Sequence, residues 1–201
     1  MARAAPYDRE TALESALALF WDKGFHATSL KDLEKSLKMK PGSIYAAFSS
    51  KENLYLLALE RYFNASRARL QDHVKASASP LGALADYLRS FATLAPDDKA
   101  RQACMLTKTL VDTRNTEPSI AAATQGYLLE IQGEFAAVFR AAQNRKELPA
   151  HLDPNRLARR FQANITALRL ALHQGMETVA FEELAEDMAR EIEDLRLPEG
   201  G

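Results

Sequence analysis

The stretch GFHATSLKDLEKSLKMKPGSIYAAFSSKENLY, residues 24–55, decides the fold. Ser29 and Asp32 have the spacing of a capping box at the start of a helix, and leucines follow at helical spacing. After a three-residue connection, Pro41 stands at a favoured first position of a second helix, in which Ile44 and Phe48 share one face. The stretch therefore predicts two short helices joined by a tight turn, the helix-turn-helix arrangement.

Amphipathic helices are also predicted on both sides of this stretch. Apolar residues at helical spacing predict a helix over residues 8–23 that ends at Gly24. Ser49 and Glu52 predict a second capping box, which opens a long helix over residues 50–76. Further helices are expected at about 81–95, 100–113, 117–145, 154–174 and 181–195. We therefore expect an all-α fold of about nine helices.

Composition narrows the classes of function. The chain has 201 residues and one cysteine, Cys104, so an internal disulfide and a zinc site of several cysteines are excluded. The four histidines are scattered, and no nucleotide-binding or nucleophile-elbow motif is present. No apolar run is long enough to span a membrane, and the first residues lack the pattern of a signal peptide. We expect a cytoplasmic protein without catalytic residues, metal or cofactor.

Positive charge is concentrated in the helix-turn-helix. The formal net charge of the whole chain is −1, whereas residues 23–51 contain six lysines and two acidic residues, a local charge of +4. The second short helix exposes small or polar-tipped residues, which allow close approach to a groove of DNA. A solvated lysine-rich surface is the alternative interpretation. The hydroxyl caps at residues 28–29 and 49–50 favour the DNA interpretation, because helix N-termini bind phosphate.

Residues 8–62 resemble the N-terminal DNA-binding domain of the tetracycline-repressor (TetR) family of bacterial regulators. The resemblance rests on Gly24-aromatic-x-x-Thr28, on Ile44-Tyr45-x-x-Phe48 and on the Ser-Lys51-Glu52 that follows. It implies phosphate contacts from Thr28, Tyr45 and Lys51, with Ser29 beside them at the first hydroxyl cap, and groove contacts from Lys40, Pro41, Ser43 and Ala46. Alanines at 46 and 47 replace hydrogen-bonding residues of many relatives, so specificity is expected to depend on Lys40, Ser43 and DNA shape.

For the rest of the chain the resemblance implies an effector-binding and dimerisation domain over residues 51–201, after a DNA-binding domain over residues 1–50. It implies a homodimer through the last two long helices, and a repressor that a small molecule of unknown class releases from a palindromic operator. The candidate pocket residues are Leu88, Phe91, Cys104, Lys108, Tyr127, Phe135, Phe161 and Asn164. Cys104 has three interpretations: packing, pocket lining, or a sensor thiol activated by Arg101 and Lys108.

Several alternatives remain open from the sequence. Gly126 and Gly133 lie on one face of a long helix, where they favour either close helix packing or space for a ligand. The same fold is also compatible with a helical module that binds a protein partner instead of DNA. An enzyme in the C-terminal helices would need clustered titratable residues, but the acidic residues at 182, 183, 186 and 187 are typical of a solvated helix face.

Overall fold

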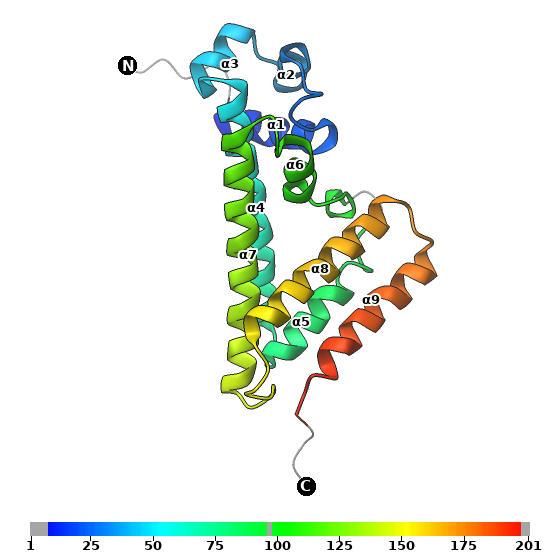
Figure 1. The fold of residues 1–201 in the computed structure, drawn as a ribbon. Coiled ribbons are helices and arrows are strands. Elements are labelled where there is room, and N and C mark those ends of the chain that lie inside the picture. The colour runs from blue at the N-terminus through cyan, green and yellow to red at the C-terminus, as the bar shows by residue number, and fades with distance from the viewer. Residues whose placement is uncertain (1–7, 96–97, 198–201) are drawn as a thin grey trace. The chain divides into compact units, whose positions relative to one another are not determined.

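The computed structural model describes residues 8–95 and 98–197, and all regular secondary structure in these ranges is helical (Figure 1). This confirms the predicted all-α fold. The elements in chain order are α1 (Arg9–Lys23), α2 (Leu30–Leu37), α3 (Pro41–Phe48), α4 (Lys51–Ala76), α5 (Pro80–Arg89), the short 3-10 helix η1 (Lys99–Arg101), α6 (Met105–Thr113), α7 (Pro118–Asn144), α8 (Pro154–His173) and α9 (Thr178–Glu193).

The chain forms two compact units. Unit 1 contains Met1–Ala65 and Met105–Tyr127, and unit 2 contains Ser66–Cys104 and Leu128–Gly201. The helices α4 and α7 contribute to both units. The division differs from the boundary expected after residue 50, because α6 and the first part of α7 pack with the N-terminal helices. A DNA-binding domain over residues 1–50 is a functional assignment and stays a prediction.

An aromatic cluster forms the core of unit 1. Tyr55 on α4 is 1% exposed, and its ring meets the edges of Phe20 at 4.7 Å and Phe25 at 5.1 Å between centroids. Ile44 and Phe48 of α3 are each 1% exposed, as their spacing predicted. Because both inward positions of α3 are anchored in this core, the opposite face of α3 is fixed at the surface.

The two predicted capping boxes have different outcomes. The first is present: the Ser29 hydroxyl accepts from the Asp32 backbone N–H at 3.1 Å, and the Asp32 carboxylate accepts from the Ser29 N–H at 2.9 Å. The second is wrong by one residue. Ser49 ends α3 with φ of 65°, and Ser50 caps α4 by accepting from the Asn53 N–H at 2.9 Å. The Glu52 carboxylate accepts a hydrogen bond from Ser119 instead.

Unit 2 has a continuous apolar core that includes buried residues of α5, α7, α8 and α9. Arg89 at the end of α5 joins α9 to this core, because its guanidinium donates to Glu186 at 2.7 Å and to Glu193 at 2.7 Å. Glu186 is therefore not part of a merely solvated face, contrary to the expectation. The predicted helix over residues 100–113 also begins later, at Met105, because η1 and an extended Gln102 precede it.

The two glycines of α7 do not serve close packing within the chain. A Cβ atom built on Gly126 or on Gly133 meets no other atom within 4 Å among the described residues. The expectation of close helix packing is therefore wrong for these two positions, as far as contacts within one chain are concerned.

Candidate DNA-binding surface

The turn between α2 and α3 is a compact structure of three residues. Lys38 ends α2 in the left-handed conformation, with φ of 53° and ψ of 38°, and its N–H donates to the Glu34 carbonyl. Met39 turns inward and is 5% exposed, whereas Lys38 and Lys40 are exposed. The turn thus places one apolar side chain in the core and two ammonium groups on the surface.

The outward face of α3 carries most of the predicted groove contacts. Tyr45 is 46% exposed, although buried residues on the other face of the same helix anchor it in the core. Lys40, Gly42 and Ala46 are exposed, and Pro41 and Ser43 are half-buried. Lys40 stands at the N-cap without a side-chain cap hydrogen bond. The face therefore combines a cation, a phenol and a hydroxyl with residues small enough for close approach to DNA.

The first hydroxyl cap is less accessible than the resemblance implies. Thr28 is fully buried, and its hydroxyl donates to the Gly24 carbonyl at 2.7 Å. Its side chain therefore stabilises the turn between α1 and α2, so its assignment as a phosphate contact stays a prediction that requires this hydroxyl to become accessible. Ser29 is exposed, but its hydroxyl is held by Asp32 at 2.7 Å. The hydrogen bonds from Lys23 and Ser29 lower the pKa of the Asp32 carboxyl well below its ordinary value.

Lys51 begins α4 and lies over the ring of Phe25, with 4.4 Å between its ammonium and the ring centroid. This cation–π contact orders the side chain near the start of the helix. Burial lowers the pKa of Lys51, while the charges of Glu117, Asp112 and Asp32 act in the opposite direction. Lys51 is thus placed by packing within unit 1, and its contact with phosphate stays a prediction.

The eight candidate effector residues do not share one environment. Leu88, Phe91, Phe135 and Phe161 are buried in the core of unit 2, where the rings of Phe135 and Phe161 are 4.8 Å apart. Asn164 lines a hollow of about 20 Å³ between α8 and α9, and Cys104 is half-buried directly before α6. Tyr127 and Lys108 belong to unit 1, where the ring of Tyr127 stacks on Phe63 at 4.6 Å. Their roles in an effector site stay predictions.

Lys108 has a contact that the sequence did not predict. Its ammonium donates to the backbone carbonyls of Trp21 at 2.7 Å and Asp22 at 3.2 Å, in the last turn of α1. A cation at this end of a helix satisfies free carbonyls and complements the helix dipole. The partners are more than 80 residues apart in the sequence, so no local pattern could have revealed this contact.

The described ranges contain neither a metal-binding cluster nor a membrane-spanning helix. No group of three or more His, Cys, Asp or Glu residues there is arranged to hold a metal ion. None of the described helices is both long enough and apolar enough to cross a bilayer.

Comparisons with known proteins agree with this architecture. The family model described as "Bacterial regulatory proteins, tetR family" matches residues 12–58, and the model "Tetracyclin repressor-like, C-terminal domain" matches residues 80–187. The HTH-type transcriptional repressor ComR of Escherichia coli is 26% identical over 170 residues, which cover 84% of this chain and 81% of ComR.

Solved structures show the same fold. A TetR-family regulator from Cytophaga hutchinsonii matches with a TM-score of 0.83 and 19% identity, over 95% of this chain and 96% of that one. The regulator CifR, solved as a cysteine mutant with 26-base-pair operator DNA, matches with a TM-score of 0.76 and 24% identity, over 94% of this chain and 98% of that one. The family consists of transcriptional regulators, so the enzyme alternative is excluded. The chain belongs to the TetR family of DNA-binding transcriptional regulators.

Proposed function

We propose that the protein is a homodimeric repressor that binds a palindromic DNA operator and is released from it by a small-molecule effector, in the cytoplasm. The observation that carries this proposal is the exposed face of α3, with Tyr45 46% exposed and Lys40 beside it. The name of a relative supports repression over activation, since ComR is described as a transcriptional repressor.

In this proposal α3 enters the major groove and the flanking cations bind phosphate. Lys40 and Ser43 supply hydrogen bonds at the start of α3, and the methyl group of Ala46 is suited to contact a thymine methyl. Tyr45 and Lys51 bind the sugar-phosphate backbone on either side, with Ser29 near the same strand. Pro41 contributes an apolar surface. These contacts are few, so one copy of α3 provides only modest affinity.

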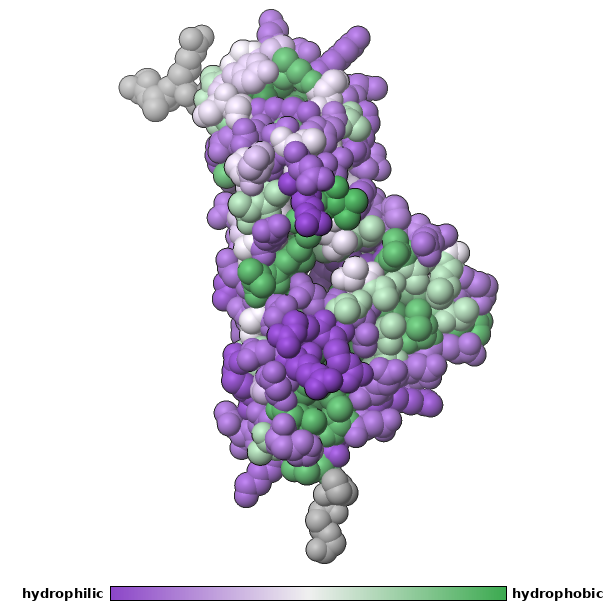
Figure 2. Space-filling model, in the orientation of Figure 1, coloured by the Kyte–Doolittle hydropathy of each residue, from purple (hydrophilic) through white to green (hydrophobic). Residues whose placement is uncertain are grey.

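A dimer supplies the remaining affinity, because two half-sites one helical turn apart are bound together. Exposed apolar residues on α8, α9 and their connection support a dimer surface. Leu170 is 48% exposed and Val179 is 57% exposed, and Met176 lies between them in the sequence with 39% exposure. Figure 2 shows apolar residues gathered over α8 and α9. Burial of such side chains against a second copy is favourable by the hydrophobic effect.

We further propose that an effector acts on α6. Within unit 1, α6 contacts two elements of the DNA-binding region: Lys108 binds the end of α1, and Thr109 and the Tyr55 hydroxyl of α4 are 2.8 Å apart in a buried hydrogen bond. A ligand that displaces α6 therefore acts directly on α1 and α4. A coupling of about 1 to 3 kcal/mol changes DNA affinity about 5- to 150-fold, which is enough for regulation.

The proposal is tested with a duplex selected from a random library by the purified full-length protein. Replacing Lys40 by alanine and Tyr45 by phenylalanine in one variant should weaken binding to this duplex at least about tenfold, because one phosphate contact and one groove contact are lost. A Lys75→Ala variant is the matched control, since Lys75 lies on α4 in unit 2 and is exposed. Equal affinity of the double variant and the control would refute the proposed roles of α3.

A further inference from the structure

Two surface stripes of opposite charge lie on neighbouring helices of unit 2. The first turns of α8 carry Arg156, Arg159 and Arg160, and all three are exposed. The outward side of α9 carries Glu183, Asp187 and Glu191, at spacings of four residues, and these are also exposed. Helical spacing of three to four residues places each set along one side of its helix.

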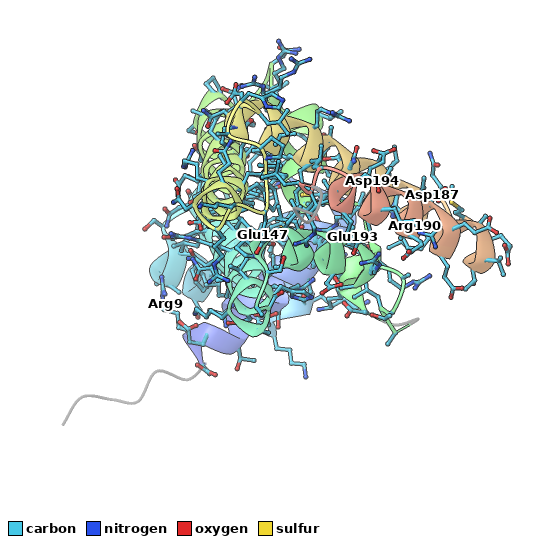
Figure 3. The ribbon with its side chains drawn as sticks, turned by 90° about the horizontal axis from the view of Figure 1, so that it is seen from below. Arg9, Glu147, Asp187, Arg190, Glu193 and Asp194 are labelled. Carbon is cyan, nitrogen blue, oxygen red and sulfur yellow. The ribbon has the colours of Figure 1, made fainter. Side chains whose placement is uncertain are left out.

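Among the described residues, these charged side chains have no salt-bridge partner. In the part of the chain that the structure describes, neither the three arginines of α8 nor the three acidic residues of α9 form a salt bridge, although other acidic residues of α9 do. Arg89 binds Glu186 and Glu193 on the side of α9 that faces α5. Figure 3 shows Asp187 and Asp194 on a different side of α9 from Glu193.

The two stripes border surface hollows. Arg156 and Arg160 line a hollow of about 410 Å³ together with three leucines, Leu152, Leu157 and Leu195, and with the polar residues His151 and Asp153. Arg160 and Glu191 line the small hollow between α8 and α9. The charged residues therefore border incompletely filled surface that is partly apolar. This is the pattern of an interface, where a charged rim surrounds an apolar centre.

The arrangement is self-complementary. An interface between two identical chains that are related by a twofold axis uses the same patch on both copies, so the patch must complement itself. A face with only arginines, or only carboxylates, would repel a second copy. A face that carries both, on the two helices that also expose the apolar residues Leu170 and Val179, attracts one.

We propose that the arginine stripe of α8, Arg156 and Arg160 above all, pairs across the dimer interface with the acidic stripe of α9 in a second copy, so that these charges determine which chains dimerise. The inference rests on the proposed homodimer and adds the partner surfaces and their chemistry. Interfacial charges of this kind contribute specificity and orientation more than raw affinity.

The test is a reciprocal charge reversal. Variant A carries Arg156→Glu and Arg160→Glu, and variant B carries Glu183→Lys, Asp187→Lys and Glu191→Lys. Each variant alone should dimerise at least about tenfold more weakly than the unmodified protein in sedimentation equilibrium, because both symmetry-related contacts become repulsive. An equimolar mixture of A and B should form heterodimers, since all contacts in that pair are attractive again.

The control is a reversal of equal size elsewhere on unit 2. Arg69→Glu with Arg140→Glu changes the net charge as much as variant A does and affects exposed arginines of α4 and α7. This control should dimerise like the unmodified protein. Circular dichroism shows whether A and B are folded. If A is unfolded, the neutral variant Arg156→Gln with Arg160→Gln replaces it. We expect this variant to dimerise with an affinity between those of A and the unmodified protein.

The outcomes separate the inference from the proposed function. An unmodified protein that is monomeric at micromolar concentration would overturn both. A normal dimer in which A and B dimerise as well as the control, or in which the mixture of A and B forms no heterodimer, would overturn the charge pairing alone and leave the homodimer in place.

Discussion

At Gly42 the fold leaves room for a side chain, so packing does not require a glycine there. A Cβ atom built there meets no described atom within 4 Å, and the position is exposed on the outward face of α3. A glycine in the middle of a helix is less favourable than alanine by about 0.5 to 1 kcal/mol, and this figure is an upper bound for Gly42, which stands in the first turn of α3. Since packing within the chain does not explain it, close approach of DNA to α3 is the physical reason that we propose.

Close approach of DNA predicts that replacing Gly42 by alanine affects stability and DNA binding in opposite directions. Gly42→Ala should leave the free energy of unfolding unchanged or raise it by up to about 1 kcal/mol, and it should weaken binding to the selected duplex severalfold. Gly133→Ala on α7 is the matched control, because its added methyl also has open space. We expect the stability gain without the loss of DNA affinity there. Unchanged affinity for Gly42→Ala, measured by fluorescence anisotropy, would rule out close approach at this residue.

At the scale of elements, ion pairs between α5 and α9 make the packing of α9 sensitive to acid. The hydrogen bonds from Arg89 and Arg190 lower the pKa of Glu186 from 4.5 to about 2, and Arg89 also lowers the pKa of Glu193. A carboxyl whose pKa is lower in the folded state stabilises that state above its unfolded pKa. This contribution is lost as the pH falls from about 4.5 towards 2.

The corresponding prediction concerns the pH dependence of stability. Replacing Arg89 by methionine should reduce stability at neutral pH, and it should flatten the decrease in melting temperature between pH 5 and pH 3. The reason is that Glu186 and Glu193 then titrate closer to their ordinary values. Thermal unfolding at several pH values measures this. A variant with the same pH profile as the unmodified protein would show that the Arg89 pairs do not contribute to it.

A second prediction for elements concerns the contact between α6 and α1. Lys108→Met keeps the aliphatic stem but removes the ammonium that binds the carbonyls of Trp21 and Asp22. We expect stability to fall by about 1 kcal/mol, because the contact is charge-assisted but only half-buried. We also expect DNA affinity to change, since α1 supports the helix-turn-helix. Lys99→Met in unit 2 serves as control, and equal DNA affinity of both variants would exclude a coupling through Lys108.

At the scale of the whole molecule, patterns of neighbouring residues were sufficient to predict the helices but not the contacts between them. The Ser29–Asp32 capping box and the inward pair Ile44 and Phe48 follow from neighbouring residues, and both are present. The cap of α4 is predicted one residue too early, because only Ser49 has a glutamate three residues later, whereas the positive φ of Ser49 ends α3 there and leaves the cap to Ser50.

Long-range partners account for most of what the sequence could not predict in the candidate site. The burial of Thr28 under its turn and the binding of Lys108 to the end of α1 depend on how helices pack, which is not encoded in local spacing. The same holds for Arg89, whose partners Glu186 and Glu193 lie about 100 residues further along the chain. The family resemblance identified the chain correctly as a DNA-binding regulator of the TetR family. The DNA-binding surface and the roles of its residues stay predictions.

The central claim is that the exposed face of α3 and its flanking lysines bind the DNA backbone and groove. The most direct test is the salt dependence of affinity for the selected duplex, compared between the unmodified protein and Lys51→Ala, which removes a proposed phosphate contact. We predict a steep linear fall of log affinity with log salt concentration, and a slope that is smaller by about 1 for each phosphate contact removed. Affinity that is independent of salt, or an identical slope and affinity in the Lys51 variant, would contradict the account.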